Sequence, residues 1–404
     1  MKPLNSLLAA TPTTIFTVIT ALAQKHGAVN LGQGFPDTEG PADIVQAASD
    51  ALHDNRNQYA PLTGLPELRE AVARGNKRFF GLDIDPATGV VVTSGATEAL
   101  AASLAALLDP GDEVVLIEPL YDTYLPTVRL LGAVPRLVRL LPPERPEEGW
   151  RLPREALRAA FGPRTKLLLL NSPMNPIGKL FDAEELAFIA GLLREHDCYA
   201  VCDEVYEHLV FDGARHVPLM TLPGMRERCV RIGSAGKSFS LTGWKVGYVS
   251  APAPLAAAIA KAHQNLVFAT APNLQRAVAF GLDKDAGYFQ ELADDLQRKR
   301  DLLSDGLRRL GFGVLPSGGS YFVVADLRPL GTELDDDGFC RLMTREAGVA
   351  AIPVSAFYGS PDAPRHLVRF AFCKREAVLR DALARLEAAM PRLRAAAVEA
   401  AVAD

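Results

Sequence analysis

Hydrophobic positions follow two alternating patterns from about residue 88 onward. Short aliphatic or β-branched runs are each followed by a longer stretch in which apolar residues recur three and four positions apart. The first pattern is typical of buried strands and the second of helices packed against them, so their alternation predicts parallel strands joined by helices. Strands are predicted at residues 90–93, 113–117, 166–170, 199–202, 229–233 and 246–250.

Two of the connecting helices have well-defined ends. A helix at 97–108 is followed by the turn sequence Asp-Pro-Gly at 109–111. A second helix at 182–196 begins with Asp182 and has Glu185 three residues later, which is the spacing of a capping box. Both are predicted to join neighbouring strands of the sheet.

The hydrophobic pattern changes beyond Asn273. One long amphipathic helical region runs to about Leu310, where Gly311 is a stop signal, and further strands are predicted at 320–326 and 367–372. We therefore expect an α/β fold with a large domain, in which helices flank a mostly parallel central sheet, and a smaller α+β domain. The expected domains are 41–285 for the large one, and 1–40 together with 286–404 for the smaller one.

Polar residues follow five of these strands at the point where each strand ends. In an open parallel sheet, ligands bind outside the carboxyl ends of the strands. The first strand is followed by small residues that open a helix, and the backbone N–H groups of such a turn can hold a phosphate. The groups that follow the five strands are, in order, Ser94-Gly95-Ala96-Thr97, Tyr121, Asn175, Asp203 with Tyr206, and Ser234 with Lys237.

An anion cradle, a ring, an amide, an acid with a phenol, and a lysine are the groups that pyridoxal phosphate uses. A lysine forms a Schiff base with its aldehyde, and an aspartate keeps the pyridine nitrogen protonated so that the ring accepts electrons. Taken alone, Lys237 fits an ordinary surface charge and Asp203 fits a strand-end cap. It is the whole set of groups at one edge that predicts this cofactor.

Composition and charge narrow the expected partners. The chain has 404 residues, of which 49% are hydrophobic and 23% are charged, as in a folded protein with a large core. Its 48 acidic and 43 basic residues are well mixed and leave a net charge of -5, so no basic pattern for nucleic acid or an anionic membrane is present. Small molecules or other protein chains are the expected partners.

Cysteines, histidines and apolar runs exclude further classes. The five cysteines lack zinc-type pairs and are too sparse for a disulfide scaffold, which suits reduced thiols in a cytoplasmic protein. The seven histidines are scattered without HxxxH or HxH spacing, so we predict no metal site. No stretch approaches the roughly 20 apolar residues of a membrane span, and an N-terminus broken by Pro12 does not fit a signal peptide.

Five motifs together resemble the fold-type I, class I/II aminotransferases, and most closely the branch of kynurenine, glutamine and methionine aminotransferases. The resemblance extends from about Thr13 to about Leu386, and the motifs occur in the order of the family. It implies a pyridoxal-phosphate transferase fold and a ping-pong transfer of an amino group from an L-amino acid to a 2-oxo acid. The motifs are LGQGFPD, NSPMNPIG, DEVYEHLVFDG, SAGKSFSLTGWKVGY and VRFAFCK.

Carried over position by position, the resemblance implies roles for the residues at the strand ends. Lys237 looks like the Schiff-base lysine and Asp203 like the partner of the pyridinium nitrogen. Tyr206 and Asn175 resemble the residues that hydrogen-bond the phenolic oxygen of the cofactor, and Tyr121 matches the ring that stacks on the pyridine. The positions that resemble the phosphate cradle are Ala96, Thr97, Ser234 and Lys245.

The resemblance also implies a second subunit and a substrate pocket. Tyr59, in NQYAPLTG, resembles the tyrosine that reaches the phosphate of the neighbouring subunit, which implies a homodimer with shared active sites. Arg369 and Gly34 match the positions that receive the α-carboxylate of the substrate, Arg369 through a bidentate pair, and Asn175 and Phe16 are also expected to bind the substrate. The segments that resemble the lining of the side-chain pocket contain Phe16, Phe268, Tyr321 and Phe357.

No second arginine that would receive a dicarboxylic substrate is evident. We therefore expect a large neutral, aromatic or sulfur-containing amino acid of the methionine, glutamine, kynurenine or phenylalanine type in preference to aspartate. Phe16 and Phe357 fit positions in the core equally well, so the lining of the pocket stays open.

Two alternative functions are weighed against this one. A pyridoxal-phosphate-dependent cysteine-S-conjugate or C–S β-lyase uses the same lysine, aspartate and arginine, and the sequence discriminates poorly between the two. A non-catalytic regulator with an aminotransferase-like domain would need an N-terminal DNA-binding extension. We do not expect one, because LGQGFPD begins at Leu31 and leaves no room for it.

Overall fold

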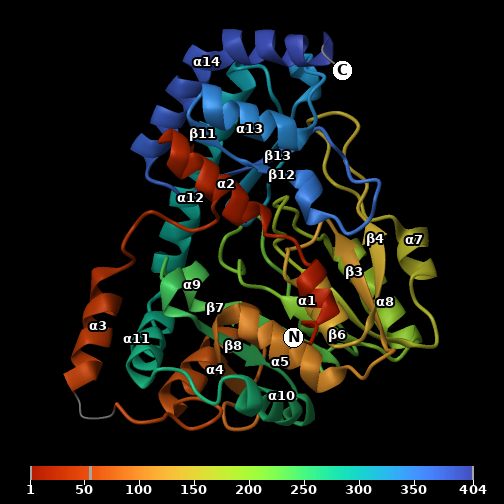
Figure 1. Cartoon of the computed structure of the whole chain (residues 1–404). Helices are drawn as coiled ribbons and strands as arrows, with labels where there is room; N and C mark the ends of the chain where they lie inside the picture. Colours follow the sequence, from red (N-terminus) through yellow and green to blue (C-terminus); the bar gives the residue numbers. More distant parts are fainter. Residues whose placement is uncertain (1, 54–56, 403–404) are drawn as a thin grey trace.

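A seven-stranded sheet forms the centre of the larger part of the molecule (Figure 1). The computed structural model describes residues 2–53 and 57–402 of the chain. The strands from β7 to β4 are mutually parallel, whereas β8 is antiparallel to both of its neighbours. The mostly parallel sheet confirms the predicted α/β class. In spatial order, the strands are β2 (Val90–Ser94), β8 (Val246–Ser250), β7 (Cys229–Ser234), β6 (Tyr199–Asp203), β5 (Thr165–Asn171), β3 (Glu113–Glu118) and β4 (Val134–Arg139).

Two strands of this sheet differ from the prediction. β8 is expected as part of the parallel series and is antiparallel instead, because the connection at 235–245 contains only short helical turns and cannot cross back over the sheet. β4 is not predicted at all. It is an edge strand beside β3 and carries Pro135 and two arginines at exposed or half-buried positions, which interrupt the hydrophobic signal.

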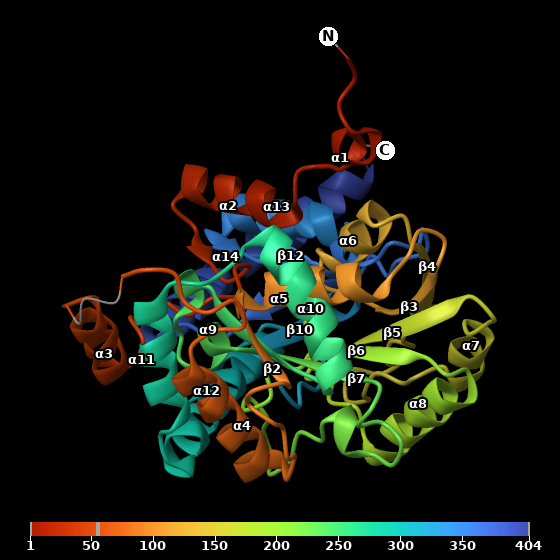
Figure 2. The ribbon, with the colours of Figure 1, turned by 90° about the horizontal axis from the view of Figure 1, so that it is seen from below.

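Alternate residues of the strands are buried on opposite faces of the sheet. Val114 and Leu116 belong to the same hydrophobic cluster as helix α5, whereas Val115 and Ile117 belong to the cluster that contains helix α8. This alternation follows from the two-residue repeat of a strand. Figure 2 shows helices on both sides of the sheet. The helices connected with it are α4 (Pro66–Phe80), α5 (Gly95–Leu107), α6 (Tyr124–Leu130), α7 (Arg154–Ala159), α8 (Ala183–Glu195), α9 (Ala235–Ser238) and α10 (Ala253–Leu266).

A second, antiparallel sheet is formed by the C-terminal third of the chain. Its order is β12-β13-β10-β9, and helices α13 and α14 lie over it at the top of Figure 1. Strand β1 of the N-terminal segment pairs in parallel with β11 of the C-terminal third. The domain boundaries themselves stay a prediction. The strands are β1 (Val29–Asn30), β9 (Gly313–Val314), β10 (Phe322–Asp326), β11 (Val349–Ala350), β12 (Ile352–Pro353) and β13 (Leu367–Ala371).

The predicted helical region beyond Asn273 is two helices, not one. The chain breaks after α11 because Asp285 accepts a hydrogen bond from the backbone N–H of Tyr288 and thereby caps the start of α12. The predicted strand at 320–326 begins two residues later, since Ser320 has a left-handed backbone with φ 66°. The remaining helices are α1 (Ser6–Ala10), α2 (Ile15–His26), α3 (Ala42–His53), α11 (Pro272–Leu282), α12 (Ala286–Arg309), α13 (Asp336–Glu346) and α14 (Glu376–Val402).

Helix ends elsewhere follow the sequence signals. Asp182 and Glu185 form the predicted capping box at the start of α8, with the Asp182 carboxylate accepting from the Glu185 N–H at 2.8 Å. Helix α5 begins at Gly95, two residues before its predicted start. In the part of the chain that the structure describes, no helix combines the length and the apolar composition of a membrane span.

Candidate active site

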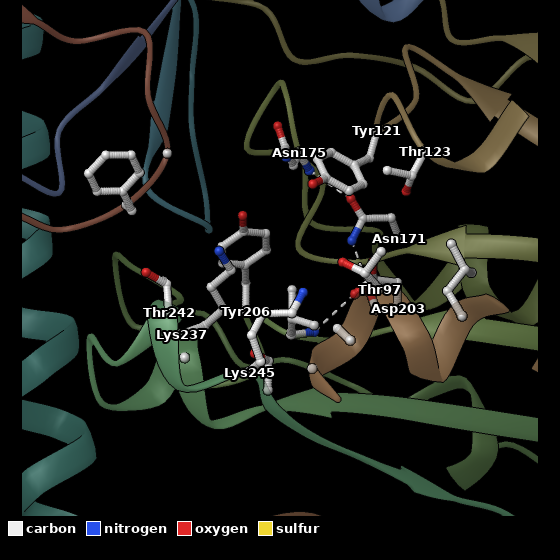
Figure 3. Close-up of a pocket in the computed structure, with 18 of the residues that line it drawn as sticks. Thr97, Tyr121, Thr123, Asn171, Asn175, Asp203, Tyr206, Lys237, Thr242 and Lys245 are labelled. Atoms are coloured by element: carbon white, nitrogen blue, oxygen red, sulfur yellow. Dashed lines mark hydrogen bonds between the residues drawn. The ribbon is translucent and has the colours of Figure 1, made fainter. Parts of the chain in front are cut away.

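A cavity of about 290 Å³ lies at the carboxyl ends of the parallel strands, where they face β10 and β13 of the second sheet. Figure 3 shows side chains from several elements gathered around this space. Of the residues singled out from the sequence, all but Tyr59, Phe268, Tyr321 and Phe357 line it. Those that line it are Phe16, Gly34, Ala96, Thr97, Tyr121, Asn175, Asp203, Tyr206, Ser234, Lys237, Lys245 and Arg369.

Lys237 enters the cavity from the short helix α9, directly after β7. Gly236 permits this turn, because a Cβ there would lie 2.9 Å from the Cα of Thr242. The Lys237 ammonium or amine donates to the hydroxyl of Tyr321 at 2.9 Å. Burial lowers the pKa of Lys237 from its ordinary value of 10.5, so the neutral amine forms at a lower pH than in free lysine.

Asp203 lies at the end of β6 with its carboxylate directed into the cavity. Its Oδ2 accepts from the hydroxyl of Tyr124 at 2.6 Å, and its Oδ1 accepts from the Val205 N–H at 3.3 Å. Burial raises the pKa of Asp203, and the hydrogen bond from Tyr124 acts in the opposite direction. Sequence reasoning missed Tyr124, although it follows Tyr121 by three residues and therefore reaches the same edge of the sheet.

Two asparagines connect the loop after β5 to the neighbouring strand. The Asn171 side chain donates to the carbonyl of Asp203 at 2.9 Å, and its oxygen accepts from the Asn175 N–H at 2.8 Å. Asn171 thus fixes the loop that carries Asn175 relative to the Asp203 carboxylate. Sequence reasoning did not single out Asn171; the signal that marks it is its place as the last residue of β5.

Arg369 of β13 is almost completely buried. Its Nη1 donates to the Asn175 side chain at 2.8 Å and its Nη2 to the Gly32 carbonyl at 2.6 Å, whereas its Nε has no partner among the described residues. Burial lowers the pKa of Arg369 to about 10, so the guanidinium stays charged at neutral pH. The guanidinium carbon of Arg369, Cζ, lies 4.0 to 5.2 Å from the ring centres of Phe322, Phe357 and Phe16.

Gly34 lies beside the aromatic rings that surround the Arg369 guanidinium. A Cβ at Gly34 would lie 2.6 Å from the Cζ of Phe322, so any side chain there would displace the ring that packs on Arg369. The space for a carboxylate next to Arg369 therefore depends on the absence of a side chain at this position.

The opposite end of the cavity is rich in hydrogen-bond donors. Gly95 has a left-handed backbone with φ 71°, and the Glu98 side chain accepts from the Ser94 N–H at 3.0 Å, which together shape the turn into α5. A Cβ at Gly247 would lie 2.5 Å from the backbone carbon of Gly95, so β8 and this turn approach as closely as glycine permits. Lys245 and three hydroxyl side chains also line the cavity, namely those of Thr97, Ser234 and Thr242.

The donor set fits pyridoxal phosphate. Backbone N–H groups of a helix N-terminus, three hydroxyls and Lys245 supply donors for a phosphate, and the half-buried Lys237 and the buried Asp203 carboxylate line the same cavity. Tyr121 adds a half-buried ring, and burial raises the pKa of its hydroxyl to about 12. The residues are therefore complementary to an aromatic, phosphorylated aldehyde.

Four of the singled-out aromatic residues have different surroundings. Tyr59 is 85% exposed, and its ring centre lies 5.3 Å from that of Phe268, outside the cavity. The structure contains one chain, so the predicted contact of Tyr59 with the cofactor phosphate of a second subunit stays a prediction. Phe357 and Tyr321 are buried behind the cavity wall instead of lining it.

Histidines take no part in the cavity. His216 and His263 are buried against Glu204 and Glu98, at 3.0 and 3.1 Å. Among residues 2–53 and 57–402, no group of three or more histidine, cysteine or acidic side chains is placed to hold a metal ion.

Comparison with known proteins gives consistent results. A family model described as "Aminotransferase class I and II" matches residues 26–386. The chain is 47% identical to the probable N-succinyldiaminopimelate aminotransferase DapC of Mycobacterium tuberculosis, over 93% of this chain and 95% of that protein. It is 40% identical to the methionine aminotransferase of Escherichia coli, over 95% and 97%. The solved structure of the N-succinyldiaminopimelate aminotransferase from Mycobacterium tuberculosis superposes with a TM-score of 0.92, covering 95% of this chain and 99% of that one.

Proposed function

The chain belongs to the class I and II aminotransferases, and from that premise we propose that it transfers the amino group of a large neutral, aromatic or sulfur-containing L-amino acid to a 2-oxo acid. The predicted family, the enzyme class and the dependence on pyridoxal phosphate are confirmed. The choice of amino acid is our proposal.

The charge of the cavity lining carries the substrate proposal. Within the described part of the chain, its cations are Lys237, Lys245 and Arg369. The first two belong to the cofactor and Arg369 to the α-carboxylate, which leaves no cation for a carboxylate on the side chain of the substrate. The rings of Phe16 and Phe322 lie beside Arg369, and Phe35 and neutral polar groups complete this part of the lining.

Each residue of the site has a definite task in this reaction. When bound, pyridoxal phosphate supplies an electron-accepting ring that makes the Cα–H bond of the amino acid acidic. Arg369 and Asn175 orient the α-carboxylate, and the amine of Lys237 accepts the proton from Cα. Asp203, held by the Tyr124 hydroxyl, would supply the negative charge that keeps the pyridine nitrogen of the cofactor protonated. Because both half-reactions use one cavity, we expect ping-pong kinetics.

A panel of amino acids tests the substrate proposal. Each is mixed with the holoenzyme without an acceptor, and the change in cofactor absorbance gives the rate of the first half-reaction. We expect methionine, glutamine, phenylalanine and kynurenine to react much faster than aspartate and glutamate. Preference for a dicarboxylic amino acid would refute the proposal, and the Lys237→Ala variant provides the baseline.

N-succinyldiaminopimelate is a second candidate, because the Mycobacterium tuberculosis relative with 47% identity bears its name. This substrate carries carboxylates far from the reacting amine, for which the described lining offers no cation. It is included in the panel, and a rate well above that of methionine would favour it.

The β-lyase alternative is separated by its products. A sulfur amino acid is incubated with and without a 2-oxo acid, and ammonia and pyruvate are measured. A lyase forms both without an acceptor, whereas the proposed aminotransferase requires the acceptor and releases no ammonia.

A homodimer with shared sites, in the cytoplasm, is part of the proposal. Tyr59 and Phe268 form an exposed aromatic pair, and all five cysteines are free and buried. Mixing inactive Lys237→Ala with weakened Tyr59→Ala and allowing subunits to exchange should restore activity, because the hybrid contains one site with both residues. No gain over the separate variants would exclude shared sites.

A further inference from the structure

We propose that Tyr321 is a positioning residue that orients the ε-amine of Lys237 and connects it to the segment that carries Gly34. The inference rests on the proposed aminotransferase function, because it assigns a partner to the base of that reaction. Tyr321 lies directly before β10, outside the cavity lining, and its side chain is almost completely buried.

Two hydrogen bonds connect the Tyr321 hydroxyl to Lys237 and Gly34, and the Tyr206 side chain is a further hydrogen-bonding neighbour. Lys237 Nζ lies 2.9 Å from the hydroxyl oxygen, and the hydroxyl in turn donates to the carbonyl oxygen of Gly34. The ring is held by its neighbours, with its centre 5.0 Å from that of Tyr206 and 4.8 Å from that of Phe322. One atom therefore joins residues that are 84 and 287 positions away along the chain.

The direction of these hydrogen bonds is determined by chemistry. The Gly34 carbonyl can only accept, so the single proton of the Tyr321 hydroxyl is committed to it. The Tyr321 oxygen must then accept from Lys237, which means that an N–H bond of the lysine points at Tyr321. When the amine is neutral, its lone pair is therefore directed elsewhere and stays free to take a proton.

Backbone hydrogen bonds of residues 319–321 hold the segment that carries the Tyr321 hydroxyl in place. Ser320 has a left-handed φ of 66°, and its N–H donates to the Leu209 carbonyl at 2.9 Å, while the Gly319 N–H donates to the Gly178 carbonyl at 3.1 Å. The Tyr321 carbonyl accepts from the Phe372 N–H at 3.0 Å, next to the strand that carries Arg369. The hydroxyl is thus fixed relative to both sheets.

The segment on the other side of the hydroxyl is held by similar contacts. Arg369 donates to the Gly32 carbonyl at 2.6 Å and Lys374 to the Phe35 carbonyl at 2.6 Å. Tyr321 is a third side chain from the C-terminal third that binds a carbonyl of this segment, and it also touches the catalytic lysine. Displacement of this segment would therefore move the partner of Lys237 as well.

The charged surroundings of Lys237 allow the effect of the hydroxyl to be isolated. Asp203, Cys373, Lys245 and Arg369 all act on its charge, and none of them is altered by removing the Tyr321 oxygen. An ammonium binds a phenolic oxygen more strongly than a neutral amine does. Loss of the oxygen therefore favours the neutral amine, whereas loosened packing would admit water and favour the ammonium.

The test is Tyr321→Phe in the full-length apoenzyme, labelled with trace acetic anhydride across a pH series. Acetylation of Lys237 is measured by peptide mass spectrometry against the exposed Lys25. We expect the labelling midpoint to move to lower pH, with Lys237 labelled about threefold to tenfold faster on the acid side of the midpoint. In the holoenzyme, kcat should fall about tenfold with little change in KM, because the base is misoriented and the carboxylate contacts remain.

Tyr358→Phe is the matched control, because the Tyr358 hydroxyl is buried and has no hydrogen-bond partner among the described residues. It should leave both the labelling midpoint and kcat unchanged. If Tyr321→Phe fails to fold, 3-fluorotyrosine at position 321 keeps the hydroxyl but weakens it as an acceptor, and a smaller shift in the same direction is expected.

An unchanged midpoint, or one that moves to higher pH, would overturn the proposal. This outcome is distinct from failure of the proposed function, since the apoenzyme labelling involves neither substrate nor turnover. A failed amino acid panel with the expected labelling shift would leave the role of Tyr321 standing and reject only the substrate assignment.

Discussion

The segment at 203–207 presents two buried polar groups to each side of the central sheet, and the two sides differ in how completely their charges are matched. On the far side, Glu204 and Glu207 face Arg231, whose Nε and Nη2 lie 2.6 and 2.7 Å from their carboxylate oxygens. On the cavity side, Asp203 and Tyr206 face the space beside Lys237.

The far side has its counter-charge within the protein. Arg231 also donates to the Asn76 side chain, and His216 lies 3.0 Å from Glu204. Burial by itself raises the pKa of Glu204, but the Arg231 charge and His216 hold it below its usual range. The charges of this cluster therefore stabilise one another in the free protein.

The cavity side is incomplete. Burial lowers the pKa of Lys237 and raises that of Asp203, so each charged form is disfavoured by its surroundings. A cofactor of complementary charge would stabilise the charged forms of Lys237 and Asp203. The comparison shows that burial alone does not mark a functional group; a buried charge without a full set of partners does.

The largest effect is expected from Lys237→Ala. Removal of the amine should abolish transfer, because no other lysine of the described cavity lining lies beside Tyr321. Borohydride should no longer fix the cofactor to the chain, and thermal unfolding should show no loss of stability, since the missing amine is disfavoured as a cation. A variant that still turned over would contradict the assignment of the base.

The next effect is on stability, from Arg231→Met. It leaves Glu204 and Glu207 buried without a counter-charge and should lower the free energy of unfolding by about 3–5 kcal/mol. Urea denaturation of the apoenzyme measures this.

A triple variant sharpens the result. Adding Glu204→Gln and Glu207→Gln to Arg231→Met should recover most of the loss, because the uncompensated charges are gone. If the triple variant were as unstable as the single one, packing of the arginine and not charge matching would account for the cluster.

The smallest effect is expected from Tyr124→Phe, which removes one hydrogen bond from Asp203. Without this donor the pKa of Asp203 is raised further, so the carboxylate is protonated as the pH falls, and activity is lost at a higher pH than in the wild type. The half-reaction should slow about tenfold at pH 6 and much less at pH 8. A uniform loss at both pH values would indicate a packing defect instead of an altered charge.

Much of the site could be predicted because strand ends are visible in the sequence. Asn175, Asp203, Ser234 and Lys237 each follow a hydrophobic run, and parallel strands bring their carboxyl ends to one edge. The capping box at Asp182 was equally visible, since a cap depends on neighbours three residues away.

Two errors concern where a helix ends and in which direction a strand runs. The helical pattern beyond Asn273 predicts one helix across residues 283–285, whereas these residues are exposed or half-buried and the Asp285 cap separates α11 from α12. Likewise, β8 has the composition of any buried strand, and its antiparallel direction follows from the short connection before it.

The sequence by itself determined the family, the class of fold and the set of side chains at the strand ends, because hydrophobic periodicity and short motifs depend on residues close together in the chain. Tertiary structure alone decided which of these groups touch. Tyr124 meets Asp203 across 79 positions, and Tyr321 meets Lys237 across 84. Such pairs have no local signature, since their distance depends on how whole elements pack. The partners of Lys237 and Asp203, and hence their charge states, are properties of the folded chain.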